Sequence, residues 1–165
     1  MSPDSDSGPS ARFRLATEAD VTCLVSIINE AFSVETFLEG TRTDRERLSA
    51  MMAAGEVLVA EDGAGKPLGC VYLEVRGVRG YLGMLAVGPS HQRTGMGRAI
   101  MLAAEQHLRN KGCQFVDICV LSKRTELPPI YRRFGYVETG VEQSHPMQPL
   151  KPGVSCHAIL MSKAL

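Results

Sequence analysis

The sequence predicts a mixed α/β fold, in which a central, mostly antiparallel sheet contains one parallel strand–helix–strand crossover and is flanked by helices. The order of apolar patterns is strand, two helices, three strands, helix, strand, helix, two strands. Three consecutive strands with short turns indicate an antiparallel meander, and a long helix between two strands indicates a parallel crossover. The 165 residues suit one domain. We expect that domain at residues 12–165, after a disordered tail at 1–11.

The first third of the chain predicts a short strand at residues 13–15 and two helices. Thr17 and Asp20 have the spacing of a helix cap, and the helix that follows has an apolar stripe. A second capping box, led by Thr43, opens a helix that stops at Gly55. The stretch between the helices is irregular. The stripe of the first helix is Val21, Leu24, Val25, Ile28 and Phe32.

The rest of the chain alternates strands with two further helices. Strands are expected at 57–60, 68–75, 81–87, 115–121, 136–141 and 156–162, and helices at 95–111 and 128–134. The segment 142–153 is too long for a simple connection, since it contains His145, Pro146, Pro149 and Pro152. We expect this loop to border the substrate site.

Composition excludes several classes of function. Lys plus Arg (18) equals Asp plus Glu (18), and no basic run would follow a phosphate backbone, so nucleic acid is not an expected partner. No apolar stretch approaches a bilayer span, and the start lacks the features of a signal peptide. The five cysteines lie mostly in apolar segments such as 118–120, so we expect small core residues, no metal, and a reducing cytoplasm.

Residues 85–98 run from a strand end, through a short loop, into the start of a helix. Their sequence is Leu-Ala-Val-Gly-Pro-Ser-His-Gln-Arg-Thr-Gly-Met-Gly-Arg. The first N–H groups of a helix have no partner within the helix, and the helix dipole favours an anion there. Gly95 and Gly97 lack the Cβ atoms that would keep a diphosphate away from these donors. The segment therefore predicts a phosphate-binding loop.

Two other phosphate loops do not fit this segment. A dinucleotide-binding fingerprint needs a small residue three positions after Gly97, where Ile100 stands. A P-loop needs Gly-Lys-Ser/Thr, which the chain does not contain.

The string Gln92-x-x-Gly95-x-Gly97, after Leu85-x-Val87-x-Pro89, resembles the coenzyme A diphosphate motif of the GNAT acetyltransferases. A second family motif, an aromatic-led Tyr-x-x-x-Gly-aromatic segment, is matched by residues 131–136. The resemblance covers the element order from about residue 13 to 162. It implies a GNAT-like fold and an enzyme that transfers an acetyl group from acetyl-CoA to a primary amine of a small molecule or peptide.

The resemblance also implies roles for particular residues. The segment Leu85, Ala86 and Val87 would pair with pantetheine, the amide of Leu85 would face the thioester carbonyl, and Tyr131 would protonate the departing sulfur. A phenol, with a pKa of about 10, can protonate a thiolate whose thiol has a pKa of about 8.5 with little driving force. The amides that would bind the diphosphate are those of Gln92, Arg93, Thr94, Gly95, Met96, Gly97 and Arg98.

The sequence leaves open which residue accepts the proton of the amine. Some family members have a Glu on the strand before the loop, where this chain has Tyr81. Glu74, on the neighbouring strand, is the first substitute, and His91, Asp117 or a chain of water molecules are the alternatives. Two further departures from the family pattern, Arg124 for an Asn and Leu127 for a small residue, affect the pantetheine contact.

The acceptor should lie between the first two helices and the last two strands. Glu30, Glu35 and Glu39 could bind a cation there, and Phe37 or Tyr72 could shape the pocket. A solvated acidic surface explains the glutamates equally. A sensor that binds acyl-CoA without turnover is the alternative function, and a homodimer is one option for the oligomeric state.

Overall fold

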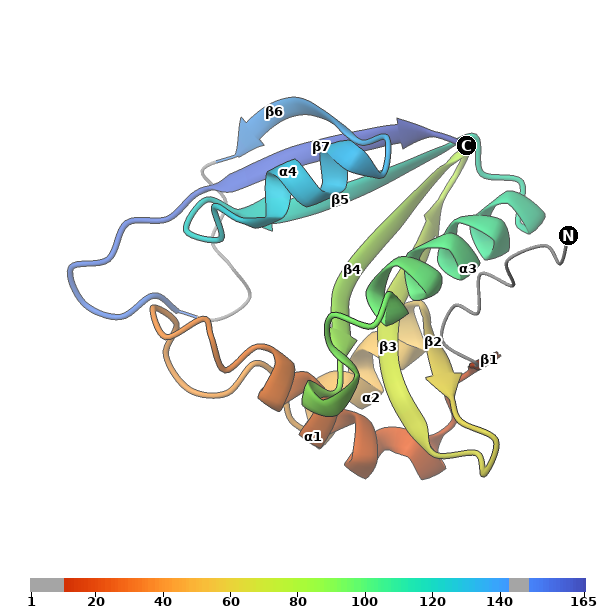
Figure 1. Cartoon of the computed structure of the whole chain (residues 1–165). Helices are drawn as coiled ribbons and strands as arrows, with labels where there is room; N and C mark the ends of the chain where they lie inside the picture. The colour runs from red at the N-terminus through yellow and green to blue at the C-terminus, as the bar shows by residue number, and fades with distance from the viewer. Residues whose placement is uncertain (1–10, 143–148) are drawn as a thin grey trace, which may run out of the picture.

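A computed structural model describes residues 11–142 and 149–165 (Figure 1). Its seven strands form one sheet in the order β1-β2-β3-β4-β5-β7-β6, in which only β4 and β5 are parallel. The strands are β1 (Arg12–Leu15), β2 (Glu56–Glu61), β3 (Pro67–Arg76), β4 (Arg79–Val87), β5 (Phe115–Leu121), β6 (Val137–Glu142) and β7 (Ala158–Ala164). The helices are η1 (Glu18–Asp20), α1 (Val21–Ala31), α2 (Arg45–Ala54), η2 (Pro89–His91), α3 (Met96–Asn110) and α4 (Leu127–Arg133). The predicted fold class is confirmed.

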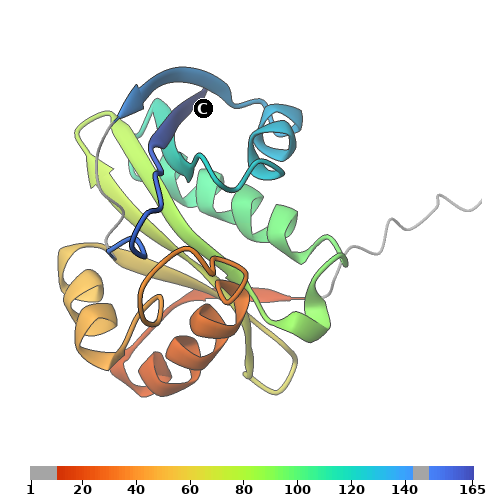
Figure 2. The same ribbon diagram turned by 90° about the vertical axis from the view of Figure 1, so that its left-hand side faces the viewer.

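Helices cover both faces of the sheet, α1 and α2 on one face and α3 and α4 on the other (Figure 2). Each face has its own core. Leu24 and Ile28 of α1 pack on the side chains of β2 and β3 that point to that face. Ile100 and Leu108 of α3 pack on the opposite face. Alternation along β2 and β3 sends successive side chains to the two cores, which explains why both strands are continuously apolar.

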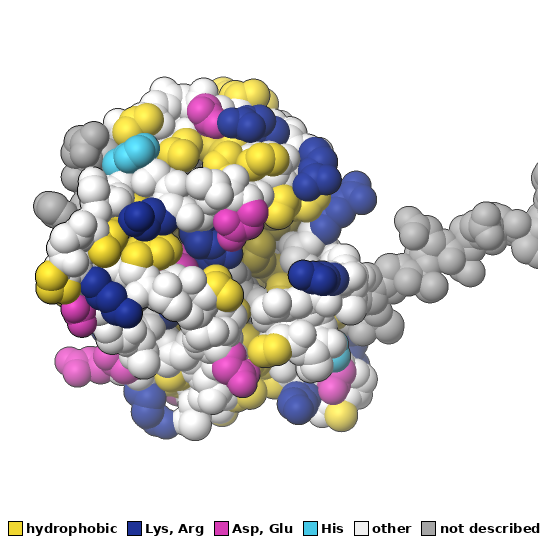
Figure 3. Space-filling view, turned by 60° about the vertical axis from the view of Figure 1, so that its left-hand side comes forward, with side chains coloured by type: hydrophobic (Ala, Val, Ile, Leu, Met, Phe, Trp, Pro, Cys, Tyr) yellow, Lys and Arg dark blue, Asp and Glu magenta, His cyan; other side chains and the backbone are white. Residues whose placement is uncertain are grey.

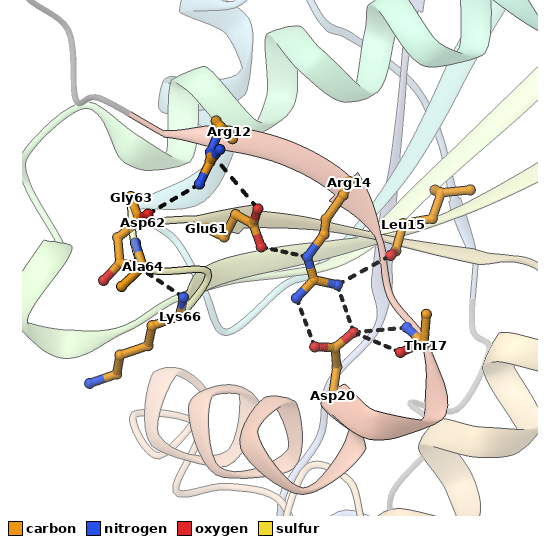
Figure 4. Close-up of polar contacts among 10 residues, drawn as sticks. All are labelled: Arg12, Arg14, Leu15, Thr17, Asp20, Glu61, Asp62, Gly63, Ala64 and Lys66. Atoms are coloured by element: carbon orange, nitrogen blue, oxygen red, sulfur yellow. Dashed lines mark hydrogen bonds and ion pairs between the residues drawn. The ribbon is translucent and has the colours of Figure 1, made fainter.

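The start of the chain is held by a buried network around Arg14 (Figure 4). Its guanidinium donates to both carboxylate oxygens of Asp20, each at 2.8 Å, and its Nε donates to Glu61 at 2.5 Å. The backbone N–H of Thr17 donates to Asp20 at 2.8 Å, in the capping geometry that the sequence predicts. Hydrogen bonds from Arg14 and Thr17 outweigh burial and lower the pKa of Asp20 to about 2.

Two local predictions need correction. The cap of α2 is Asp44, whose carboxylate accepts from the N–H of Arg47 at 2.8 Å, and not Thr43. Thr43 is buried and its N–H donates to Asn29. Cys119, expected in the core, is exposed, because its side of β5 lines a cavity. The predicted strand boundaries differ by about two residues, since β4 begins at Arg79 and β7 at Ala158.

β4 and β5 are paired only near their first residues. The parallel register joins Arg79, Gly80 and Tyr81 to residues 115–117, and beyond these residues the two strands diverge (Figure 1). β4 also has an extra residue relative to β3, because Cys70 pairs with Ala86 and Tyr72 with Gly83. This β-bulge turns β4 away from β5. The sheet is therefore open in its middle, at the carboxyl ends of its parallel strands.

Candidate active site

A cavity of about 610 Å³ lies where β4 and β5 diverge. It extends from the loop between β4 and α3 to the end of α1 and the loop that follows it. Figure 3 shows this hollowed face, with hydrophobic side chains in the hollow and both acidic and basic side chains around it. The lining includes Leu85, Val87, Gln92, Arg93, Gly97 and Tyr131, which the two sequence motifs contain.

One end of the cavity consists of backbone N–H groups without acceptors. Within residues 11–142 and 149–165, none of the N–H groups of residues 92–98 donates to a protein acceptor, and no side chain caps α3. The loop is instead held by other groups, since the side chain of Gln92 donates to the carbonyl of Val87 at 3.2 Å. Helix starts with uncapped donors bind anions, because the helix dipole adds to these donors.

Two residues of this loop have a left-handed backbone conformation. Gly95, which precedes the first turn of α3, has φ 85°, and Arg93 has φ 62°. An L-residue at positive φ costs about 1 kcal/mol or more, which glycine avoids. A Cβ at Gly97 would have only an ordinary contact with Val87, at 3.8 Å. The space in front of Gly97 is therefore open to a ligand. Thr94 and Arg98 are exposed beside it, and the Met96 side chain is buried.

The bulge of β4 leaves two residues beside the cavity without a partner in the sheet register. Met84 has φ 51°, which is uncommon for a residue with a side chain. Met84 and Leu85 have no partner residue in the register of β4 with the described residues of β3 or β5. Leu85 and Val87 line the cavity, whereas Ala86, 1% exposed, points into the core below α1. Because successive side chains of a strand point to opposite faces, a ligand in the cavity would contact the side of β4 that carries Leu85 and Val87.

Tyr131 lines the same cavity from α4. Its ring meets Tyr136 edge to face, with centroids 5.9 Å apart at 74°. Burial raises the pKa of Tyr131, and the positive charge of Arg124 acts in the opposite direction. The phenol is therefore protonated at neutral pH, as a proton donor must be. The cavity brings together Tyr131, Leu85 and the loop before α3, which is represented in the lining by Gln92, Arg93 and Gly97.

The candidate bases lie in different places. Glu74 is not among the described residues that line the cavity. Its carboxylate accepts from Arg76 and from the hydroxyl of Tyr72, both at 2.9 Å, and these two hydrogen bonds lower its pKa. Asp117 accepts from Arg79 at 2.6 and 2.8 Å, and from Ser162. Both carboxylates are thus occupied by other groups.

Tyr81 occupies the family's position for a base, on β4 just before the bulge. Burial raises the pKa of its phenol, while Arg42 and Arg76 act in the opposite direction. The Arg76 guanidinium lies 4.7 Å above the Tyr81 ring. A phenol whose pKa is raised is already protonated at neutral pH, so it cannot accept the proton of the amine. His91, which lies in η2, is outside the cavity lining.

The other end of the cavity contains a buried ion pair that sequence reasoning did not find. Arg124 Nη1 donates to Glu35 Oε2 at 2.7 Å, and Arg124 Nε donates to Glu126 at 2.6 Å. The side chains of Arg124 and Glu35 are 17% and 5% exposed. The second oxygen of Glu35 is buried without a hydrogen-bond partner among the described residues. No local pattern could indicate this pair, since its members are 89 positions apart.

The loop after α1 is also fixed to the segment before β7. Leu38 and Leu150 form an isolated bridge, Glu39 N–H donates to Pro149 at 2.8 Å, and Lys151 N–H donates to Phe37 at 3.0 Å. The expectation that the 142–153 loop borders the site can be tested only at 149–153, since 143–148 lie outside the described residues. Of the residues suggested for the acceptor, Glu30 and Glu35 line the cavity, and Glu39, Phe37 and Tyr72 do not.

The described residues contain neither a group of metal-binding side chains nor a membrane-spanning helix. They contain no group of three or more His, Cys, Asp or Glu side chains that could bind a metal ion. Within the same residues, no helix is both long and apolar enough to cross a membrane.

Several solved structures share this fold. The ribosomal-protein-S18-alanine N-acetyltransferase of Escherichia coli has a TM-score of 0.74 and 16% identity, over 94% of each chain. The phosphinothricin acetyltransferase of Sinorhizobium meliloti, solved with acetyl-CoA, has a TM-score of 0.73 and 17% identity, over 94% of this chain and 88% of that one. A GNAT acetyltransferase of Elizabethkingia anophelis, with acetyl-CoA bound, has a TM-score of 0.74 and 17% identity, over 95% and 99%.

At 16–17% sequence identity, the similarity to these structures shows a shared fold and no more. No curated protein sequence is significantly similar to this chain. Residues 19–147, however, match the sequence profile of the family described as "Acetyltransferase (GNAT) domain". This match covers most of the chain and agrees with the fold and with the cavity that residues 92–98 and Tyr131 line, so the protein belongs to the GNAT acetyltransferase family.

Proposed function

We propose that the protein transfers an acetyl group from acetyl-CoA to a primary amine by direct attack of the amine on the thioester. One observation carries the proposal: a single cavity joins the free N–H groups of residues 92–98 to Leu85 and Tyr131. The diphosphate of coenzyme A would bind at the start of α3, and pantetheine would extend along Leu85 and Val87. Similar proteins have been solved with acetyl-CoA bound, which supports this assignment.

The proposed reaction has two bond changes at the thioester carbon. The amine nitrogen bonds to the carbonyl carbon, and the oxygen that becomes negative accepts a hydrogen bond from the N–H of Leu85. The carbon–sulfur bond then breaks, and the sulfur takes the proton of the Tyr131 hydroxyl. The amine attacks in its neutral form. After the attack, the positively charged nitrogen loses a proton to water, and a proton from water returns to the Tyr131 oxygen. A water chain accounts for this transfer better than Glu74, which lies outside the cavity lining.

The proposal is tested by calorimetric titration with acetyl-CoA and by release of free thiol in the presence of a panel of amines. We expect binding, and thiol release that depends on the amine. Binding without thiol release for any amine would favour an acyl-CoA sensor instead. Absence of binding would contradict both functions.

Gly97→Glu tests the phosphate loop. A carboxylate at residue 97 would face the diphosphate and repel it, so we expect acetyl-CoA affinity to fall at least about 100-fold. The matched control is Gly97→Ala, because its Cβ would meet only Val87 at 3.8 Å. Both variants should melt within a few degrees of the wild type. Unchanged affinity in Gly97→Glu would show that coenzyme A does not use this loop.

A further inference from the structure

The charges that line the cavity are not evenly matched. Arg93 belongs to the phosphate loop, and four other charged side chains line the cavity from α1, the loop after it, and the β5–α4 loop. These four are Glu30, Glu35, Arg42 and Arg124. Glu35 and Arg124 pair with each other at 2.7 Å, so this pair leaves little net charge for a ligand. Glu30 is exposed and solvated. The remaining cation is Arg42.

Arg42 is half-buried and stacks on Phe32, yet no carboxylate of the described residues pairs with it. Its Cζ lies 4.7 Å from the centroid of the Phe32 ring, which covers one face of the guanidinium. Among the described residues, no carboxylate oxygen lies within 4.0 Å of its nitrogens. Stacking uses the face of the group and leaves its N–H donors, which lie in the plane, available. Such a guanidinium can bind a carboxylate through two parallel hydrogen bonds.

The position of Arg42 separates it from the diphosphate end. Arg42 lies in the loop between α1 and α2, where we expect the acceptor, and it stacks on Phe32. Residues 92–98 instead lie between β4 and the first turn of α3. Arg42 therefore lies on the side of the thioester position from which the amine would arrive.

We propose that Arg42 is a specificity-determining residue that binds a carboxylate of the acceptor, so that the favoured acceptor is an amine that also bears a carboxylate, as an amino acid does. This inference rests on the proposed function for the identity of the second substrate. An amine without a carboxylate would leave the guanidinium of Arg42 partly desolvated and unpaired in the cavity. This cost disfavours the binding of such an amine.

The experiment compares amino acids with their amides, which differ only in the carboxylate. Values of kcat/KM are measured for the wild type and for Arg42→Gln, together with the KM for acetyl-CoA. The control variant is Arg45→Gln, since Arg45 is an exposed neighbour whose side chain donates to Thr22 and does not line the cavity. The ratio of variant to wild type cancels the difference in intrinsic reactivity between an amino acid and its amide.

We expect Arg42→Gln to lower kcat/KM at least about tenfold for amino acids and less than about twofold for amides, with the KM of acetyl-CoA unchanged. Arg45→Gln should change none of these values. Equal losses for both acceptor types would overturn the inference, and so would a raised KM for acetyl-CoA, which would assign Arg42 to the cofactor. Binding of an amino acid and its amide to the protein saturated with coenzyme A is measured in parallel by calorimetry. Tighter binding of the amino acid than of its amide, lost in Arg42→Gln, would support the carboxylate site even if no turnover occurred. Equal binding of the amino acid and its amide to the wild type would overturn the carboxylate site.

Discussion

Tyr131 and Tyr136 touch edge to face, but their hydroxyl groups have different surroundings. Tyr131 lines the cavity, whereas the hydroxyl of Tyr136 is buried without a hydrogen-bond partner among the described residues. Only the first hydroxyl can reach a ligand. The two residues therefore form a natural pair of test and control, because the same change, loss of one oxygen, can be made at both.

Tyr131→Phe should lower kcat by about 10² to 10⁴, because a positioned acid contributes about that factor. Steady-state thiol release measures it. Tyr136→Phe should leave kcat unchanged and stabilise the fold by about 1 kcal/mol, because it removes a buried donor that has no acceptor. A similar loss of kcat in both variants would mean that the ring packing matters, and not the Tyr131 hydroxyl.

The pH dependence of kcat/KM should rise through neutrality, because an alkyl amine with a pKa of about 10.4 must lose its proton before it attacks. A falling limb would report deprotonation of Tyr131. Burial raises the pKa of Tyr131 above its ordinary value of about 10, so no falling limb is expected below about pH 10. A decline near pH 8 in a protein that is still folded would argue against Tyr131 as the acid.

At the scale of elements, the Arg14 network joins β1 and η1 to the end of β2. The folded-state pKa of Asp20, about 2, lies below that of an unfolded Asp. Its contribution to stability is therefore complete above about pH 5 and is lost as the pH falls through about 2.

Asp20→Asn should lower the free energy of unfolding by about 1 to 2 kcal/mol at pH 7, and the difference from the wild type should shrink as the pH falls from 5 to 2. Urea unfolding at several pH values measures it. A difference that stays constant with pH would mean that Asp20 stabilises the fold without its charge.

At the scale of the whole molecule, Arg124 connects the two halves of the chain across the open sheet. It contacts Glu35, in the loop after α1, and Glu126, ahead of α4. β4 and β5 pair only through residues 79–81 and 115–117, and the loop after α1 also contacts residues 149–151. The ion pair therefore stabilises the walls of the cavity relative to each other.

Arg124→Met should cost about 3 to 5 kcal/mol, because it leaves the buried Glu35 carboxylate without a donor. The double variant Arg124→Met/Glu35→Gln should recover part of this loss, since the unpaired charge is gone. Urea unfolding of the two single variants and the double variant gives the coupling energy. Additive losses would mean that Arg124 and Glu35 act independently.

The sequence alone determined the element order and the parallel crossover, and it indicated the glycine-containing segment 92–98 and Tyr131 as candidate site residues. Apolar periodicity is local, and the glycines and the aromatic motif lie within a few residues of one another, so no long-range contact is needed to recognise them. The assignments of Leu85, Tyr131 and residues 92–98 to catalysis or cofactor binding stay predictions. The homodimeric state also stays a prediction.

The tertiary structure decided which of these parts meet, and what surrounds them. The divergence of β4 from β5, the bulge at Met84 and the Arg124–Glu35 pair depend on contacts between distant segments. The same packing places Cys119 and Arg42 in the cavity lining, where Arg42 has no carboxylate partner among the described residues. A side chain's direction and partners depend on packing between elements, which a local pattern does not contain.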